Sequence, residues 1–121
     1  MKKLIIIDDE PLIRKYLSAL LVKKYNIVTF KCAEDAISYI NSSDDIDHIL
    51  CDYMMKNING LELLDEIIKL NYFNDYTKHF LFMTAYEDNQ VYYKLISTGC
   101  RVVKKTSISQ DLLEDIFKSY E

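Results

Sequence analysis

The sequence contains little glycine or proline and no long apolar run. Only two glycines and one proline occur among 121 residues, and no segment has the composition of a flexible linker. The apolar run after Lys2 and Lys3 is too short for a signal-peptide core or a membrane span. We therefore expect one soluble, cytoplasmic domain over residues 1–121, with no membrane association.

An excess of basic residues is also missing. Asp and Glu outnumber Lys and Arg by 19 to 15, for a net charge of -4, so direct nucleic-acid binding is not expected. The three cysteines, Cys32, Cys51 and Cys100, are widely spaced, which is typical of unpaired thiols rather than a disulfide framework or a metal site. His48 and His79 have no partners at metal-ligand spacing, and neither is assigned a function.

Five short apolar runs alternate with segments of helical periodicity. Half of the residues are hydrophobic, which is enough for one core. The predicted strands are Leu4–Ile7, Ile27–Phe30, Ile49–Cys51, Phe80–Met83 and Val102–Val103. Apolar stripes predict a helix that begins at Pro11 and contains Leu12, Ile13, Tyr16, Leu17, Leu20 and Leu21, and further helices over 33–40, 61–68, 91–96 and 112–120. This alternation predicts an α/β fold with a parallel sheet and helices on both faces.

Four of the five predicted strands are followed by residues that could share one polar site, and only the second strand, followed by Lys31 and Cys32, lacks such a group. In such sheets the functional crevice lies beyond the carboxyl ends of the strands. If the first, third, fourth and fifth strands lie side by side, these residues converge at one edge of the sheet. The residues concerned are Asp8, Asp9 and Glu10 after the first strand, Asp52 after the third, Thr84 after the fourth, and Lys104 and Lys105 after the fifth.

Together these groups suit phosphoryl transfer. Asp8, Asp9 and Asp52 form a set of hard oxygen ligands for a divalent cation such as Mg²⁺. The cation would offset the repulsion among crowded carboxylates, which otherwise raises their pKa values. Asp52 could attack a phosphoryl group and become an acyl phosphate, while a lysine and the cation neutralise the phosphoryl oxygens. Thr84 could donate a hydrogen bond to the transferred group.

Four segments resemble the signatures of bacterial response-regulator receiver domains. They are "LIIIDDEPLIR", "DHILCDYMMKNINGLELL", "FLFMTAYED" and "GCRVVKK". They occur in the order of that family and cover nearly the whole chain. The resemblance implies a flavodoxin-like (βα)5 fold, with a five-stranded parallel sheet in the order 2-1-3-4-5.

The resemblance also implies roles for the acids. Asp52 would accept the phosphoryl group, and a sensor histidine kinase would donate it. Asp9 and Asp52 would bind Mg²⁺ directly with the backbone carbonyl of Met54, while Asp8 would act partly through water.

Further implied roles concern the switch. Thr84 would be the switch hydroxyl, Lys105 would pair with the phosphate, and Gly60 matches a glycine eight residues after the acceptor. The domain would be regulatory rather than an enzyme, promoting only its own phosphorylation and dephosphorylation. Its fourth helix, fifth strand and fifth helix would control an output, with transcription expected, through homodimerisation or a fused output domain.

The sequence departs from the family at several positions. Lys56 stands where a proline is usual, and Thr106 follows Lys105 where the family has a proline, commonly after a cis bond. That bond is then either trans or strained. The segment before the lysine is short, which leaves Lys104 as an alternative to Lys105.

The same alignment puts Val102 at the place of an aromatic switch residue. Either Thr84 and its loop act alone, or a nearby tyrosine such as Tyr86 substitutes. Two other functions stay open: a degenerate receiver that binds partners without phosphate, and a small enzyme on the same fold. An aspartyl phosphatase needs a second Asp at the place of Met54, and no glycine-rich phosphate loop follows the first strand.

Overall fold

A computed structural model describes residues 1–85 and 88–119. Five parallel strands form one sheet in the order β2-β1-β3-β4-β5, which confirms the predicted fold class and strand order. The strands are β1 (Lys2–Ile7), β2 (Tyr25–Phe30), β3 (His48–Asp52), β4 (Phe80–Thr84) and β5 (Arg101–Lys104). The helices are α1 (Pro11–Leu21), α2 (Ala33–Asn41), α3 (Gly60–Leu70), α4 (Asn89–Ile96) and α5 (Gln110–Lys118), with short 3-10 helices η1 (Tyr76–Lys78) and η2 (Lys105–Ser107).

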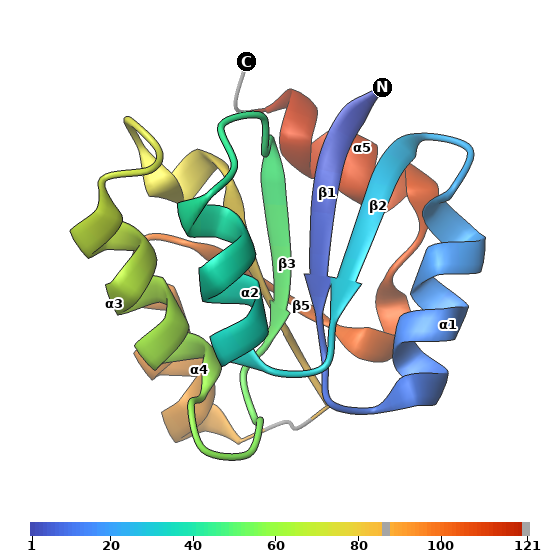
Figure 1. Ribbon diagram of the computed structural model, residues 1–121. Coiled ribbons are helices and arrows are strands. Elements are labelled where there is room, and N and C mark those ends of the chain that lie inside the picture. The colour runs from blue at the N-terminus through green and yellow to red at the C-terminus, as the bar shows by residue number, and fades with distance from the viewer. Residues whose placement is uncertain (86–87, 120–121) are drawn as a thin grey trace.

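The helices cover both faces of the sheet (Figure 1). Helices α1 and α5 pack on one face, where Leu17 and Leu113 belong to the same buried cluster as the strand residues Leu4 and Ile6. Helices α2, α3 and α4 pack on the other face, over Ile5 and its neighbours. Successive strand residues point to opposite faces, so the continuous apolar runs of β1, β3 and β4 supply two cores.

Helix α1 differs in one respect from its predicted stripe. It begins at Pro11 as predicted, but Leu12 is 79% exposed and Tyr16 is 54% exposed. Only Leu17 and Leu21 of this helix are fully buried, because it covers one side of a sheet that ends at the edge strand β2. The face of α1 that is buried against the sheet is therefore narrower than its stripe of apolar residues.

A serine caps the start of the last helix. The Ser109 hydroxyl accepts a hydrogen bond from the backbone nitrogen of Leu112 at 3.1 Å, as expected of an N-cap. Among residues 1–85 and 88–119, no helix combines the length and the apolar character needed to cross a membrane.

Candidate functional site

Two carboxylates lie buried where adjacent strands end. Asp8 directly follows β1 and is 0% exposed, and Asp52 is the last residue of β3 and is 3% exposed. The backbone nitrogen of Asp8 donates to the Phe30 carbonyl at 3.1 Å, and its Oδ1 accepts from the Glu10 nitrogen at 2.9 Å. Arg14 donates to the Asp8 carbonyl at 2.7 Å. These contacts, made by both the backbone and the side chain of Asp8, fix the position of its carboxylate.

Lys105 joins the two carboxylates. Its Nζ lies 2.7 Å from Asp8 Oδ2, 3.2 Å from Asp52 Oδ2 and 3.5 Å from Glu10 Oε1. The side chain comes from η2, which begins directly after β5, and it is buried, whereas Lys104 is exposed. The structure therefore places Lys105, and not Lys104, among the acids.

The peptide bond between Lys105 and Thr106 is trans. Within residues 1–85 and 88–119 the peptide bonds are trans, including the one before Thr106. The chain continues from β5 into the short 3-10 helix η2. Of the two conformations that the sequence left open for this bond, the trans form is the one present.

The surroundings shift the pKa values of Asp52 and Lys105. Burial, followed by the negative charge of Asp8, raises the pKa of Asp52 to about 6, although Lys105 and the Met54 backbone lower it. Burial lowers the pKa of Lys105, but its contacts with Asp8 and Asp52 outweigh that effect and raise it to about 12. The lysine therefore stays charged at neutral pH and stabilises the ionised acids.

Three consecutive acids form a group of oxygens that could hold a metal ion. The carboxylate oxygens of Asp8, Asp9 and Glu10 lie within 4.8 Å of one another. Glu10 was not among the metal ligands predicted from the sequence, although its position next to Asp9 was a signal. Asp52 is linked to this group through Lys105. Hard carboxylate oxygens are the donors that Mg²⁺ and Ca²⁺ prefer, so this set fits such a cation.

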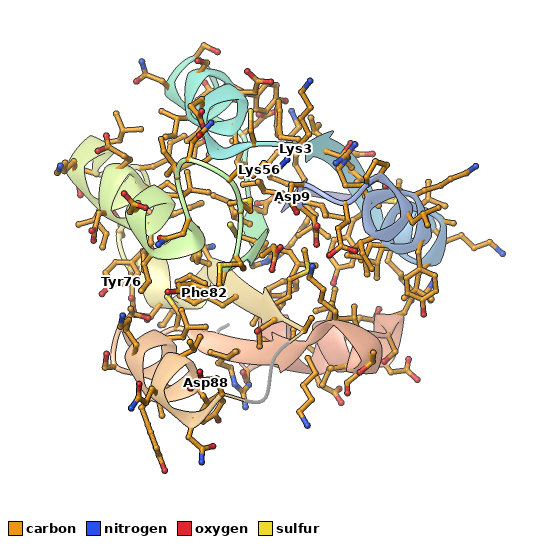
Figure 2. All side chains as sticks on the ribbon, turned by 90° about the horizontal axis from the view of Figure 1, so that it is seen from below. Lys3, Asp9, Lys56, Tyr76, Phe82 and Asp88 are labelled. Atoms are coloured by element: carbon orange, nitrogen blue, oxygen red, sulfur yellow. The ribbon has the colours of Figure 1, made fainter. Side chains whose placement is uncertain are left out.

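A cavity of about 260 Å³ opens beside these acids. It is lined by Asp9, Glu10, Asp52, Met54, Ala85 and Lys105. Figure 2 views this end of the sheet, with Asp9 close to its middle. Thr84, at the end of β4, is 6% exposed, and its neighbour Ala85 lines the cavity. Val102 is partly buried in β5, and Tyr86 lies outside the described residues.

Gly60 fixes the loop that follows Asp52. A Cβ at this position would lie 2.8 Å from the Asp52 carbonyl oxygen and 3.1 Å from Tyr53 Cα. The Gly60 nitrogen donates to the Tyr53 carbonyl at 2.8 Å, and Asn59 and Glu62 form a capping box at the start of α3. Helix α3 can therefore begin against the backbone at the end of β3 because Gly60 has no side chain.

Comparisons with known proteins identify the family and the fold. The sequence model described as "Response regulator receiver domain" matches residues 4–117. The solved structure of the response regulator TrrA from Thermotoga maritima, in complex with Mg(2+)-BeF, is 30% identical with a TM-score of 0.78, and 100% of each chain is covered. No curated protein matches the sequence significantly.

Two further solved structures share the fold. A receiver domain from Clostridium thermocellum is 18% identical with a TM-score of 0.83, covering 99% of this chain and 94% of that one. The N-terminal domain of a three-domain response regulator/sensory box/GGDEF protein from Carboxydothermus hydrogenoformans is 22% identical, with a TM-score of 0.80 and coverage of 98% and 93%.

Proposed function

The chain belongs to the response-regulator receiver family, a family of regulatory domains, and on this premise we propose that Asp52 is its phospho-acceptor. One observation carries the proposal. A buried, charged Lys105 pairs with both Asp8 and Asp52 on the wall of a cavity of about 260 Å³. We further propose that residues 1–121 form one such domain, which does not itself bind nucleic acid.

In this proposal Mg²⁺ binds the acidic set. Asp8, Asp9 and Asp52 would hold it with the backbone carbonyl of Met54, and Glu10 lies close enough to take part. The donors are carboxylate and carbonyl oxygens, as Mg²⁺ requires. The bound ion would supply positive charge near the phosphoryl oxygens.

The chain's own residues would carry the transfer. A carboxylate oxygen of Asp52 attacks phosphorus, and the bond from phosphorus to the donor breaks, so that the donor atom leaves with the electron pair. With a sensor histidine kinase as donor, that atom is a nitrogen of its phosphohistidine. The product is an aspartyl phosphate, and Lys105 and Thr84 would contact its oxygens. The domain would thus promote its own phosphorylation and dephosphorylation only.

Phosphorylation would then change the surface formed by α4, β5 and α5. The phosphoryl group adds charge and acceptor oxygens at Asp52, and the Thr84 hydroxyl would move toward them. Val102 supplies no aromatic ring for this step, so the proposal assigns it to Thr84 and its loop. The altered surface would serve homodimerisation or a fused output domain in the cytoplasm, with control of transcription as the expected output.

A degenerate receiver is the second candidate. Its support lies in Lys56 and Thr106, which replace the prolines usual at these two positions of the family. Such a domain would bind partners through the same fold without accepting phosphate.

Intact-protein mass separates the two functions. The protein is incubated with Mg²⁺ and acetyl phosphate, with Asp52→Asn as the matched control because asparagine keeps the side-chain shape. A gain of one phosphoryl group that the control lacks supports phospho-acceptance. Absence of a gain, together with absence of Mg²⁺ binding by titration, would instead support the degenerate receiver.

A further inference from the structure

A second cavity adjoins the first and shares Asp9 with it. This cavity of about 290 Å³ is lined by Asp9, Lys31, Cys32, Lys56 and Asn57. Figure 2 labels Asp9 and Lys56, which lie next to each other at the carboxyl end of the sheet. Asp9 therefore separates an acidic cavity from one that has two lysines on its wall.

The two lysines come from different elements. Lys31 directly follows β2, and Lys56 belongs to the loop between β3 and α3. The Lys56 carbonyl accepts from the Ile58 nitrogen at 2.9 Å, and Asn57 adopts a left-handed conformation with φ of 67°. The tight loop fixes the backbone from which Lys56 extends, so its position beside Asp9 follows from the fold.

The charges around the first cavity leave it unfavourable for anions. Asp8, Asp9, Glu10 and Asp52 contribute four carboxylates, and Lys105 contributes one ammonium group. Even a bound divalent cation leaves this group with net negative charge. A phosphoryl donor is itself an anion, and charges act on an approaching ion over roughly 10 Å at moderate salt.

We propose that Lys31 and Lys56 form a cationic rim that attracts anionic phosphoryl donors to Asp52. The ligand class is a low-molecular-weight acyl phosphate, and the inference rests on the proposed function. A carboxylate oxygen of Asp52 forms the new bond to phosphorus, while the bond between phosphorus and the acyl oxygen breaks. The released carboxylate keeps the electron pair, and no proton or oxidant is needed. The rim brings the donor to this position and takes no part in the bonding.

The rim should have opposite effects on the binding of the phosphoryl donor and of Mg²⁺. Its positive charge favours the donor anion and disfavours the Mg²⁺ cation. Removing both amines therefore slows phosphorylation and tightens Mg²⁺ binding. General damage to the site would weaken both, so the two readouts separate an electrostatic role from a structural one.

The test compares two double variants of equal charge. Lys31→Ala/Lys56→Ala removes the rim, and Lys23→Ala/Lys78→Ala removes two lysines near the amino ends of β2 and β4. The rate of phosphorylation by acetyl phosphate with saturating Mg²⁺ is followed by intact mass at low and high salt. We expect the rim variant to react about fivefold more slowly at low salt and to approach the wild type at high salt. The control variant should stay close to the wild type.

Three results would overturn the inference. Equal rates for the wild type and the rim variant at low salt would refute it while leaving phospho-acceptance intact. A salt-independent loss of rate with weaker Mg²⁺ binding would also refute it. If the wild type gains no phosphoryl group at all, the proposed function fails first and the inference fails with it.

Discussion

The Nζ atom of Lys105 lies 2.7 Å from Asp8 Oδ2, and the two side chains are only 7% and 0% exposed. The same ammonium group lies 3.2 Å from Asp52 Oδ2. A single cation thus holds together carboxylates that follow β1 and end β3. Removing one partner of a buried ion pair leaves an uncompensated charge, which costs more than the pair itself contributes.

Lys105→Met should therefore lower the free energy of unfolding by about 3 kcal/mol at neutral pH without metal. Added Mg²⁺ should restore part of the loss, because a second cation then compensates the same acids. Urea unfolding with and without Mg²⁺ measures both effects. Lys104→Met is the control, and its effect should stay within about 0.5 kcal/mol because this neighbour is exposed. Equal destabilisation by the two variants would contradict the assignment.

Gly60→Ala should disturb the loop that follows Asp52. The new methyl group would meet the Asp52 carbonyl oxygen at 2.8 Å, so the backbone must shift, at a cost of about 2 kcal/mol. Gly99→Ala is the matched control, since this glycine has φ of 87° and precedes β5 at the opposite end of the sheet. Both variants should lose stability in urea, but only Gly60→Ala should weaken Mg²⁺ binding. An unchanged Mg²⁺ affinity would show that the loop tolerates the methyl group.

Met54 should make the aspartyl phosphate long-lived. It lines the cavity with Asp52 and is 53% exposed, and its thioether cannot orient a water molecule for attack. Met54→Asn should shorten the lifetime about tenfold, since an amide can hydrogen-bond that water, whereas Met54→Leu should leave it unchanged. The loss of phosphoryl mass after removal of acetyl phosphate gives the lifetime. Equal lifetimes for the Asn and Leu variants would count against this role.

Thr84 should carry the conformational response without help from an aromatic partner at Val102. Backbone amide chemical shifts of residues 89–104 are compared before and after beryllofluoride and Mg²⁺ are added. The wild type and Thr84→Ser should respond alike, because both have a hydroxyl group, whereas Thr84→Ala should bind the ligand but lose most of the response. A full response in Thr84→Ala would place the switch elsewhere.

Much of this architecture could be predicted from local patterns. The apolar runs of β1, β3 and β4 are covered on both faces, so each had to be buried as a whole, and the order of the sheet followed from the resemblance. The acids at Asp8 and Asp52 could be assigned to one site because parallel strands end at the same edge.

Other features depend on tertiary geometry. The local pattern favoured Lys105, since that alignment keeps Val102 and Val103 in the strand, but it left Lys104 as an alternative. The turn into η2 decides which of the two lysines points at the acids. Leu12 and Tyr16 fit the apolar stripe of α1, yet the helix lies at the sheet margin and leaves them exposed. The closeness of Lys56 to Asp9 likewise depends on a loop conformation with a left-handed Asn57.

His48 occupies the opposite end of the sheet from the acids. Its ring stacks on Phe117 of α5, with ring centroids 3.7 Å apart and an interplanar angle of 7°. It also stacks on His79, with ring centroids 5.4 Å apart. It is 3% exposed, and among the described residues neither ring nitrogen has a hydrogen-bond partner. Burial, then the charges of His79 and Lys2, lower the pKa of His48 to about 4, against a raising effect of Asp47.

This pKa predicts a loss of stability in acid. The unfolded chain takes up a proton on His48 near pH 6.5, whereas the folded chain does so only near pH 4. The free energy of unfolding should therefore fall between these pH values, by about 3 kcal/mol in total. Asp52, with its pKa raised to about 6, acts in the opposite direction, so the effect must be measured as a difference between variants. His48→Phe keeps an aromatic ring against Phe117 and cannot titrate. Urea unfolding of both proteins from pH 7 to pH 4 should show the variant gaining stability relative to the wild type as the pH falls. A difference that stays constant with pH would mean that the folded and unfolded chains protonate His48 at the same pH, which contradicts the lowered pKa.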